Sequence, residues 1–375
     1  MCSIVSPMSG EVLFVLEDFR GKNAKDVKNA AAAELGISAL RQRFLSQDGA
    51  RVIEDDEVLS GEMVTLQLVK LEYLPPNAEE DGKMASAARD NDLVALNELL
   101  RCPRDPNVTD DTGRTASHHA AEHGHVEAMQ LLLSAGARMD ARDMSMGCWA
   151  PLHVACHHGQ LAILRLLIEA GVDINMATSD GETPVDIAAR DGQEKILRIL
   201  IEADVDPQRA SPRDGFLPLH VAAVHNHPEV VCLLLWERVD ADTPTRDGWT
   251  ALQLAARNGN MAVVRKLVGF RLYWWFQQHV FSIFFPMLGC FFSRIAGFFF
   301  RSTNHPGLDI DKATQHGTAL FLAAAEGHAK VVRLLIHCKA DVEKGGPLRV
   351  AMLNRDDEVA ALLREAGADV AAAEG

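Results

Sequence analysis

Histidines are the residues of this sequence best suited to metal binding and proton transfer, because neutral imidazole binds metals and exchanges protons near pH 7. Four histidines fall within residues 118–125, and two more follow Cys156 directly. His119 and His123 are one helical turn apart, a spacing that could give two ligands of a metal site. The alternative, which we favour, is that these imidazoles have structural roles, so we expect no metal site.

The sequence lacks the motifs that mark common enzyme classes. It contains no Gly-x-x-x-x-Gly-Lys-Ser/Thr phosphate loop, no His-Glu-x-x-His, no Gly-x-Ser-x-Gly and no kinase signature set. The paired acids Asp110 and Asp111 lie in a turn, where carboxylates cap and solvate the backbone. We expect a protein that is not an enzyme, with no catalytic residue, no cofactor and no small-molecule substrate.

Composition places the 375 residues among foldable globular chains, with 48% hydrophobic and 24% charged residues. The net charge of −15 argues against a nucleic-acid partner, which selects for a basic face. Seven widely spaced cysteines form no Cys-x-x-Cys pair, and no signal peptide is evident at the start. These features predict a cytoplasmic protein.

One short sequence pattern recurs along the chain, and it would position most of the histidines and acidic residues named above. Successive copies begin 35, 33, 34, 33 and 68 residues apart, and each continues into an Ala-rich stretch, a glycine and a Leu-rich run. The copies are Thr115-Ala116-Ser117-His118, Ala150-Pro151-Leu152-His153, Thr183-Pro184-Val185-Asp186, Leu217-Pro218-Leu219-His220, Thr250-Ala251-Leu252-Gln253 and Thr318-Ala319-Leu320-Phe321.

Each position of this pattern has a physical reason. Thr caps a helix N-terminus, and Pro is tolerated in the first helical turn. Paired alanines allow close helix packing, and a glycine such as Gly124 ends the first helix in the left-handed conformation. The Leu-rich run is the buried face of a second helix, and Asp-Gly pairs such as 247–248 form a tight turn.

The pattern resembles the ankyrin repeat, whose signature is T-P-L-H-x-A with a period near 33. The resemblance implies a mostly α solenoid over residues 83–375, with about eight helix-turn-helix units joined by β-fingers. Residues 83–110 and 346–372 resemble terminal capping units, which a solenoid needs for solubility.

Residues 1–74 lack the repeat and read as a small α+β domain. Strands are predicted at 12–16, 44–45 and 64–69, with a helix over 24–35. Residues 75–82, with two prolines followed by acidic residues, are predicted to be a linker.

Several fragments of this domain resemble ubiquitin in order and spacing, among them Gln42-Arg43-Phe44-Leu45 and Thr65-Leu66-Gln67-Leu68-Val69. The resemblance implies a β-grasp fold and places ubiquitin's exposed apolar patch on Leu45 and Val69, unless both are core residues. The domain ends without Gly-Gly, so it is not expected to be conjugated to other proteins.

Residues 269–303 interrupt the repeats with an apolar insertion. The insertion contains ten of the fifteen phenylalanines, and 272–293 form a charge-free run of 22 residues between two arginines. Such a run is long enough to cross a membrane, but one crossing would separate neighbouring repeats.

Three interpretations of the insertion stay open: a peripheral or re-entrant membrane contact, a buried or partner-facing hairpin, and a block of non-native sequence such as a retained intron. A membrane contact would involve Trp274, Trp275, Phe284, Phe285, Phe291 and Phe292.

The resemblance implies a scaffold or adaptor that binds protein partners on the concave surface formed by finger tips and first helices. The candidate contact residues are Asp111, Arg114, Met144, Trp149, Glu182, Arg213, Phe216, Arg246 and Trp249. The two tryptophans are either exposed anchors or packing residues between repeats.

Alternatives are a membrane-associated adaptor and a non-catalytic regulatory subunit of an enzyme complex. A ubiquitin-like domain would link the chain to ubiquitin or proteasome pathways by analogy. The repeat signature reports a fold and not a target, so the partner, the pathway and the oligomeric state do not follow from it.

Overall fold

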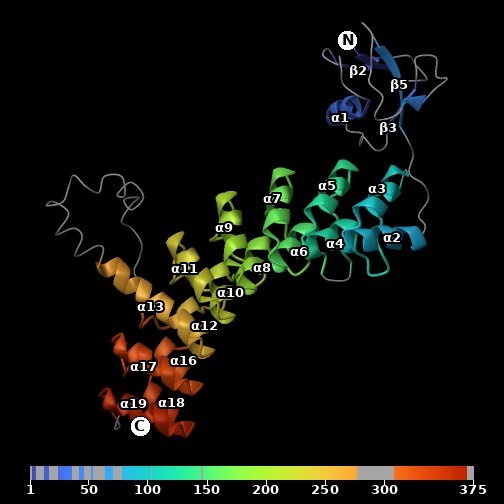
Figure 1. Cartoon of the computed structure of the whole chain (residues 1–375). Coiled ribbons are helices and arrows are strands. Elements are labelled where there is room, and N and C mark those ends of the chain that lie inside the picture. Colours follow the sequence, from blue (N-terminus) through green and yellow to red (C-terminus); the bar gives the residue numbers. More distant parts are fainter. Residues whose placement is uncertain are drawn as a thin grey trace, which may run out of the picture. The chain divides into compact units, whose positions relative to one another are not determined.

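The computed structural model of the chain describes residues 2–5, 12–16, 24–35, 42–45, 52–53, 64–70, 78–102, 104–144, 147–276 and 308–369 (Figure 1). The chain divides into two compact units, Met1–Asp173 and Ile174–Gly375. Among the described residues, the first contains a small sheet and three helix pairs, and the second contains five helix pairs.

The N-terminal part of the first unit is a five-stranded sheet with one helix, in the order β2-β1-β5-β3-β4. β1 and β5 are parallel, and the other pairs are antiparallel. The elements are β1 (Cys2–Val5), β2 (Val12–Leu16), α1 (Ala24–Leu35), β3 (Gln42–Leu45), β4 (Val52–Ile53) and β5 (Val64–Lys70).

The core of this sheet follows from the alternation of its strands and the period of its helix. Ile4 pairs in register with Leu66 across β1 and β5, and both are buried. Phe44 pairs with Ile53 across β3 and β4, and both are buried as well. α1 places three buried apolar residues at positions 24, 27 and 31, the spacing of one helix face.

The remaining helices form pairs in which a short first helix is followed by a second. The first unit has α2 (Ala78–Arg89) and α3 (Leu93–Arg101), α4 (Ala116–His123) and α5 (Val126–Ser134), and α6 (Pro151–His157) and α7 (Leu161–Glu169). The second has α8 (Pro184–Arg190) and α9 (Glu194–Glu202), α10 (Pro218–Val224) and α11 (Pro228–Trp236), α12 (Ala251–Arg257) and α13 (Met261–Phe276), α16 (Ala319–Ala325) and α17 (Ala329–His337), and α18 (Pro347–Leu353) and α19 (Asp357–Glu365).

Helix α2 begins at Ala78, inside the stretch predicted as a linker. The acidic residues Glu79, Glu80 and Asp81 that suggested a solvated linker lie in its first turn. Carboxylates are favourable there because the N-terminal end of a helix carries partial positive charge.

Packing between neighbouring pairs stabilises these helices, because helices of seven or eight residues are not stable alone. Alanines such as Ala120 and Ala188 are fully buried on the first helices and allow close approach. The second helices bury their aliphatic face, as Ile163, Leu164 and Leu167 do in α7.

The glycine that ends a first helix also makes room for the next repeat. Gly124 has a φ of 75°, and a Cβ on it would overlap the side-chain amide of Gln160. That amide donates to the carbonyl of Glu122 at 2.8 Å. In the second unit, a Cβ on Gly192 would overlap His227, whose Nε2 donates to the Arg190 carbonyl at 2.7 Å.

The repeats on either side of the insertion pack as the others do. Gln253 in α12 donates to the carbonyls of Lys312 and Gly317, at 3.1 and 2.8 Å. α13 is 16 residues long, whereas the second helices α11 and α17 have nine. Residues 277–303 of the insertion, and the four residues after it, lie outside the described part. Among the helices of the described residues, none combines the length and apolar composition that a bilayer crossing needs.

Candidate partner-binding surface

One pair of positions makes contact at the junction between finger and first helix in four of the repeats. The residue just before the helix N-cap contacts the residue eight positions later, at the end of that helix. The N-cap backbone is extended, with ψ near 160°, so it lays the preceding residue alongside the two helical turns. We call these the finger–helix pairs: Arg114 with Glu122, Trp149 with His157, Glu182 with Arg190, and Trp249 with Arg257.

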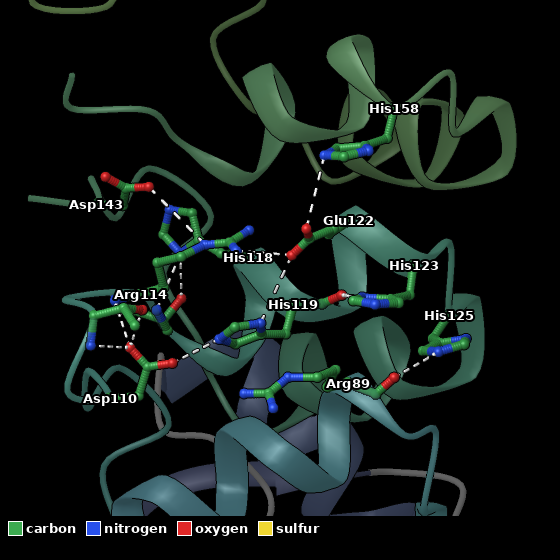
Figure 2. Close-up of polar contacts among 12 residues, drawn as sticks. Arg89, Asp110, Arg114, His118, His119, Glu122, His123, His125, Asp143 and His158 are labelled. Atoms are coloured by element: carbon green, nitrogen blue, oxygen red, sulfur yellow. Dashed lines mark hydrogen bonds and ion pairs between the residues drawn. The ribbon is translucent and has the colours of Figure 1, made fainter. Parts of the chain in front are cut away.

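In the repeat of α4, the pair is an ion pair. Nη1 of Arg114 lies 2.7 Å from Oε2 of Glu122, and its Nε lies 4.0 Å from the buried carboxylate of Asp143 (Figure 2). Partial burial would raise the pKa of Glu122, but hydrogen bonding and attraction from Arg114 outweigh burial and lower it. His158 adds a further positive neighbour when protonated, with Nε2 3.9 Å from Glu122.

In the repeat of α6, the predicted exposed anchor Trp149 is 9% exposed. Its ring meets His157 edge-on at 5.4 Å and lies 6.4 Å from His153. Of the two interpretations left open for this tryptophan, exposed anchor and packing residue, its burial favours packing, because the indole lies against two imidazoles of the first helix. Such aromatic contacts stabilise the joint between finger and helix.

In the repeat of α8, the charges are exchanged. Glu182 precedes the helix, and Oε2 lies 2.6 Å from Nη1 of Arg190. Arg190 also contacts Asp191 at 3.2 Å. This guanidinium is thus shared by two carboxylates, an arrangement that orients it well.

The repeats of α12 and α10 each have an aromatic residue just before the helix N-cap. Trp249 is half-buried, with His316 stacked on its ring at 3.7 Å and the guanidinium of Arg257 5.1 Å from its centre. Phe216 is also half-buried and meets His220 edge-on at 5.7 Å. These contacts hold both rings in place while leaving part of each surface accessible.

The other predicted contact residues lie near the finger tips. Asp111 is exposed, and Met144 is 81% exposed beside Gly113. Arg213 and Arg246 reach the preceding finger. Nη1 of Arg213 donates to the Asp180 carbonyl and carboxylate, both at 3.1 Å, and Nη1 of Arg246 donates to the Arg213 carbonyl at 3.0 Å.

The histidine of the repeat signature closes the joint from inside. Nδ1 of His118 accepts from the backbone N–H of Thr115 at 3.2 Å, so its Nε2 carries the proton and donates to the Trp149 carbonyl at 2.9 Å. His220 makes the same two contacts with Leu217 and Thr243. Burial lowers the pKa of both imidazoles, to about 4 for His220.

His119 is paired with Asp110, and Nε2 lies 2.7 Å from Oδ2 (Figure 2). Burial lowers the pKa of His119 more than this hydrogen bond raises it. The pKa of Asp110 is about 2, because hydrogen bonds from Thr112 and His119 overcome its burial. At neutral pH the contact is therefore a hydrogen bond from a neutral imidazole to a carboxylate.

The suspected metal pair His119 and His123 does not face a common point. Nδ1 of His123 lies 3.1 Å from the backbone carbonyl of His119, whereas the His119 ring turns to Asp110. Over the described ranges, no cluster of three His, Cys, Asp or Glu side chains is arranged to hold a metal ion.

Other predicted residues lie where side chains are not described. Leu45 and Val69 belong to β3 and β5, with Arg43 pairing with Val69 along the ladder. Trp274 and Trp275 lie in the helical backbone of α13. The four phenylalanines of the proposed membrane contact, Phe284, Phe285, Phe291 and Phe292, lie outside the described residues.

Sequence reasoning named one member of each finger–helix pair and missed the other. Glu122, His157, Arg190 and Arg257 all follow their partners by eight residues. That constant spacing, read across the aligned copies, is the signal that could have found them.

Comparison with known proteins agrees with this architecture. The family profile described as "Ankyrin repeats (3 copies)" matches residues 84–178, 145–211, 170–247, 219–273 and 297–373. The crystal structure of the human ASB11 ankyrin repeat domain superposes with a TM-score of 0.53 at 22% identity. That superposition covers 68% of this chain and 99% of that one.

Curated relatives include a human protein and a mouse protein of different kinds. Ankyrin repeat and SOCS box protein 3 of Homo sapiens is 35% identical over 192 residues, 51% of this chain and 37% of that protein. Protein phosphatase 1 regulatory subunit 27 of Mus musculus is 36% identical over 100 residues, 26% of this chain and 62% of that protein. The chain thus spans less than two thirds of the length of either. Because the family profile matches more than half of its residues, the chain belongs to the ankyrin-repeat family.

Proposed function

We propose that this chain is a non-catalytic scaffold that binds protein partners through its fingers and first helices. The observation that carries the proposal is the set of finger–helix pairs. They fix charged and aromatic side chains at one position of successive repeats. Side chains already held in place lose little conformational entropy when a partner binds.

Two rings in the second unit are the best candidates for contact. Trp249 and Phe216 are half-buried, and each ring contacts a histidine ring, that of His316 and His220 respectively. Tryptophan and arginine dominate binding energy at many protein interfaces, and Arg257 lies against the Trp249 ring. Trp149 is too buried to contribute in this way and more plausibly stabilises its repeat.

The test is quantitative affinity capture with the full chain. The double variant Phe216→Ala/Trp249→Ala should lose captured proteins that the wild type retains. Trp236→Ala is the matched control, because this exposed tryptophan lies on the second helix α11. Equal capture by all three proteins, with folding unchanged, would remove the finger–helix pairs from the binding surface.

We also infer that residues 1–74 form a ubiquitin-like domain that links the scaffold to ubiquitin or proteasome pathways. A five-stranded sheet with parallel central strands β1 and β5 and one helix supports the β-grasp interpretation. Full-length protein should bind immobilised ubiquitin receptors of the proteasome, and Leu45→Ala/Val69→Ala should weaken that binding. Binding that is absent, or unchanged in the variant, would argue against the inference.

A second candidate function is that of a regulatory subunit in an enzyme complex. The similarity to protein phosphatase 1 regulatory subunit 27 favours it, because that match covers 62% of the relative. Co-precipitation with the catalytic subunit of protein phosphatase 1 is the direct test, and its absence would leave the general scaffold role standing.

We place this scaffold in the cytoplasm. Among the described cysteines no disulfide is present, and Cys156 is buried as a small apolar residue would be. Reduced cysteines suit a reducing compartment. Fractionation of cells that express the full chain tests the assignment.

A further inference from the structure

The second helices each present one exposed stripe, and on two neighbouring helices that stripe is basic. α13 exposes positions 262, 265, 266 and 269, and α17 exposes positions 330, 333 and 337, the spacing of a single helix face. The charged residues of these stripes are Arg265, Lys266, Lys330 and Arg333, which we call the basic face. α13 and α17 pack against each other as neighbouring second helices (Figure 1). The four cations are all exposed on these two adjacent helices.

The basic face contains no acidic residue, although the whole chain has a net charge of −15. Neither α13 nor α17 has an Asp or Glu anywhere in its sequence. The other second helices in this unit all carry acidic residues, and Glu229 is the only charged residue of α11. On α9, Arg198 pairs with Glu194 at 2.8 Å, and α19 begins with two acids.

Among the described residues, the four cations also have no ion-pair partner. In the described part of the chain, no carboxylate lies within ion-pair distance of Arg265, Lys266, Lys330 or Arg333. Concentrated like charges repel one another and lower stability slightly. A surface that an acidic protein leaves uncompensated is suited to an anionic binding partner.

Aromatic residues adjoin the basic face. Trp236 ends the neighbouring helix α11 and is 54% exposed. The backbone of α13 stays helical for seven residues beyond Gly269, through the sequence Phe-Arg-Leu-Tyr-Trp-Trp-Phe. Tryptophan, tyrosine and arginine together are the residues enriched at the boundary between lipid and water.

We propose that the basic face of α13 and α17 docks the solenoid onto an anionic phospholipid surface. Lysine and arginine near such a surface are attracted by the negative potential of the leaflet, and neighbouring aromatic side chains add interfacial binding. The face is separate from the finger–helix pairs, so the scaffold could hold a protein partner and a membrane at once.

A membrane fits the surroundings of this face better than a nucleic acid does. From residue 249 to 308 the sequence has no acid, and its aromatic residues are concentrated in the apolar insertion that follows α13. A nucleic-acid site would use cations with few aliphatic neighbours, whereas this face leads directly into the most apolar segment of the chain.

Vesicle flotation of the full-length protein tests the proposal. Vesicles of phosphatidylcholine alone are compared with vesicles that also contain phosphatidylserine, at low and at high salt. The protein should float with the anionic vesicles only, and salt should weaken this association. The variant Arg265→Glu/Lys266→Glu/Lys330→Glu/Arg333→Glu should bind at least about tenfold more weakly.

A matched control separates the location of the charges from their number. Lys195→Glu/Arg209→Glu/Lys344→Glu/Arg349→Glu changes the net charge equally at other exposed positions of this unit and should bind as the wild type does. Equal loss in both variants, or no association with anionic vesicles, would overturn the proposal. Retention on heparin without vesicle binding would overturn it in favour of a polyanion site.

A deletion distinguishes this face from the apolar insertion. The variant lacking residues 269–303 should still bind anionic vesicles in a salt-dependent manner, because the four cations remain. Complete loss of binding in a deletion variant that stays folded would assign the membrane contact to the insertion and overturn the role of the basic face. Failure here leaves the protein-binding scaffold untouched, since its test uses Phe216 and Trp249.

Discussion

The repeats of α4 and α8 close the same finger-to-helix joint with opposite charges. In the α4 repeat the finger supplies Arg114 and the helix supplies Glu122, at 2.7 Å. In the α8 repeat the finger supplies Glu182 and the helix Arg190, at 2.6 Å. The same two positions therefore accept an ion pair of either polarity in these two repeats.

The inner side of the two joints differs more deeply. His118 accepts a hydrogen bond from Thr115 and donates one to the Trp149 carbonyl. Asp186 occupies the same position, and its Oδ2 accepts from both the N–H and the hydroxyl of Thr183, at 2.9 and 2.8 Å. Its other oxygen, Oδ1, is buried and has no hydrogen-bond partner among the described residues.

In three repeats this position holds one atom that accepts within the repeat and one that donates onward, from His118, His220 and Gln253. Neutral imidazole supplies both, and so does the amide of Gln253, which accepts from Thr250 and donates to Lys312. A carboxylate can only accept, whereas a protonated carboxyl can also donate. Burial raises the pKa of Asp186, against the two hydrogen bonds from Thr183. The two joints should therefore respond to pH in opposite directions.

The largest expected effect is acid destabilisation of the histidine joints. His118, His119 and His220 have folded-state pKa values below 6.5, about 4 for His220, so the unfolded state binds more protons between these values. Stability is then full above pH 6.5 and falls as pH drops towards 4, by about 3 kcal/mol from His220 alone. Urea unfolding of the full chain between pH 7 and pH 4.5 measures this loss.

A glutamine variant provides the control. His118→Gln/His220→Gln keeps an acceptor and a donor at each joint, as Gln253 does, but cannot be protonated. Its pH dependence should be clearly flatter than that of the wild type. Hydrogen exchange, corrected for the intrinsic rate, should show the α4 segment losing protection at pH 5 while the α8 segment does not. Parallel loss in both segments would contradict the comparison.

The next effect is the removal of one histidine joint at neutral pH. His118→Ala leaves the buried Thr115 N–H without its partner inside the protein and opens a small cavity. It also removes one of the hydrogen bonds to the Trp149 carbonyl, which still accepts from the N–H of Asp143 at 2.8 Å. An unsatisfied buried group together with a cavity should cost about 2–4 kcal/mol. Thermal unfolding should show this loss in His118→Ala and a much smaller one in His118→Gln. Equal losses would mean that ring packing, and not the two hydrogen bonds, holds the joint.

The frame of these joints could be predicted from the sequence, because caps, glycines and Leu-rich runs are local signals with a fixed period. Thr183 and Asp186 were recognisable as a repeat start for that reason. The burial of Trp149 could not be predicted, since it depends on His153 and His157 filling the space beneath the ring. The direction of a charge pair likewise depends on two residues whose contact no single copy of the repeat reveals.

A smaller effect is expected from Asp186→Asn. The carboxamide of this variant can accept from Thr183 through its oxygen and donate through its nitrogen, and it does not ionise. The wild-type carboxyl gives its full stability below its unfolded pKa of 3.8 and loses it as pH rises through the raised folded value. The variant should be more stable than the wild type by about 1 kcal/mol at pH 8 and by less at pH 5. A destabilised variant at pH 8 would show that the ionised carboxylate is preferred.

The smallest effect should come from exchanging the charges of one outer pair. Glu182→Arg/Arg190→Glu would give the α8 repeat the polarity of the α4 repeat. Because both side chains are partly exposed, the pair contributes about 0.5 kcal/mol, and the double exchange should recover most of what either single change loses. A double-mutant cycle measures this coupling, and recovery should stay incomplete because Asp191 now faces a carboxylate.

The same exchange in the α4 repeat meets the buried Asp143, 4.0 Å from Arg114, so it should recover less. If both exchanges recovered equally, the surrounding carboxylates would not set the direction of the pair, and the opposite polarities of the two repeats would have no structural cause.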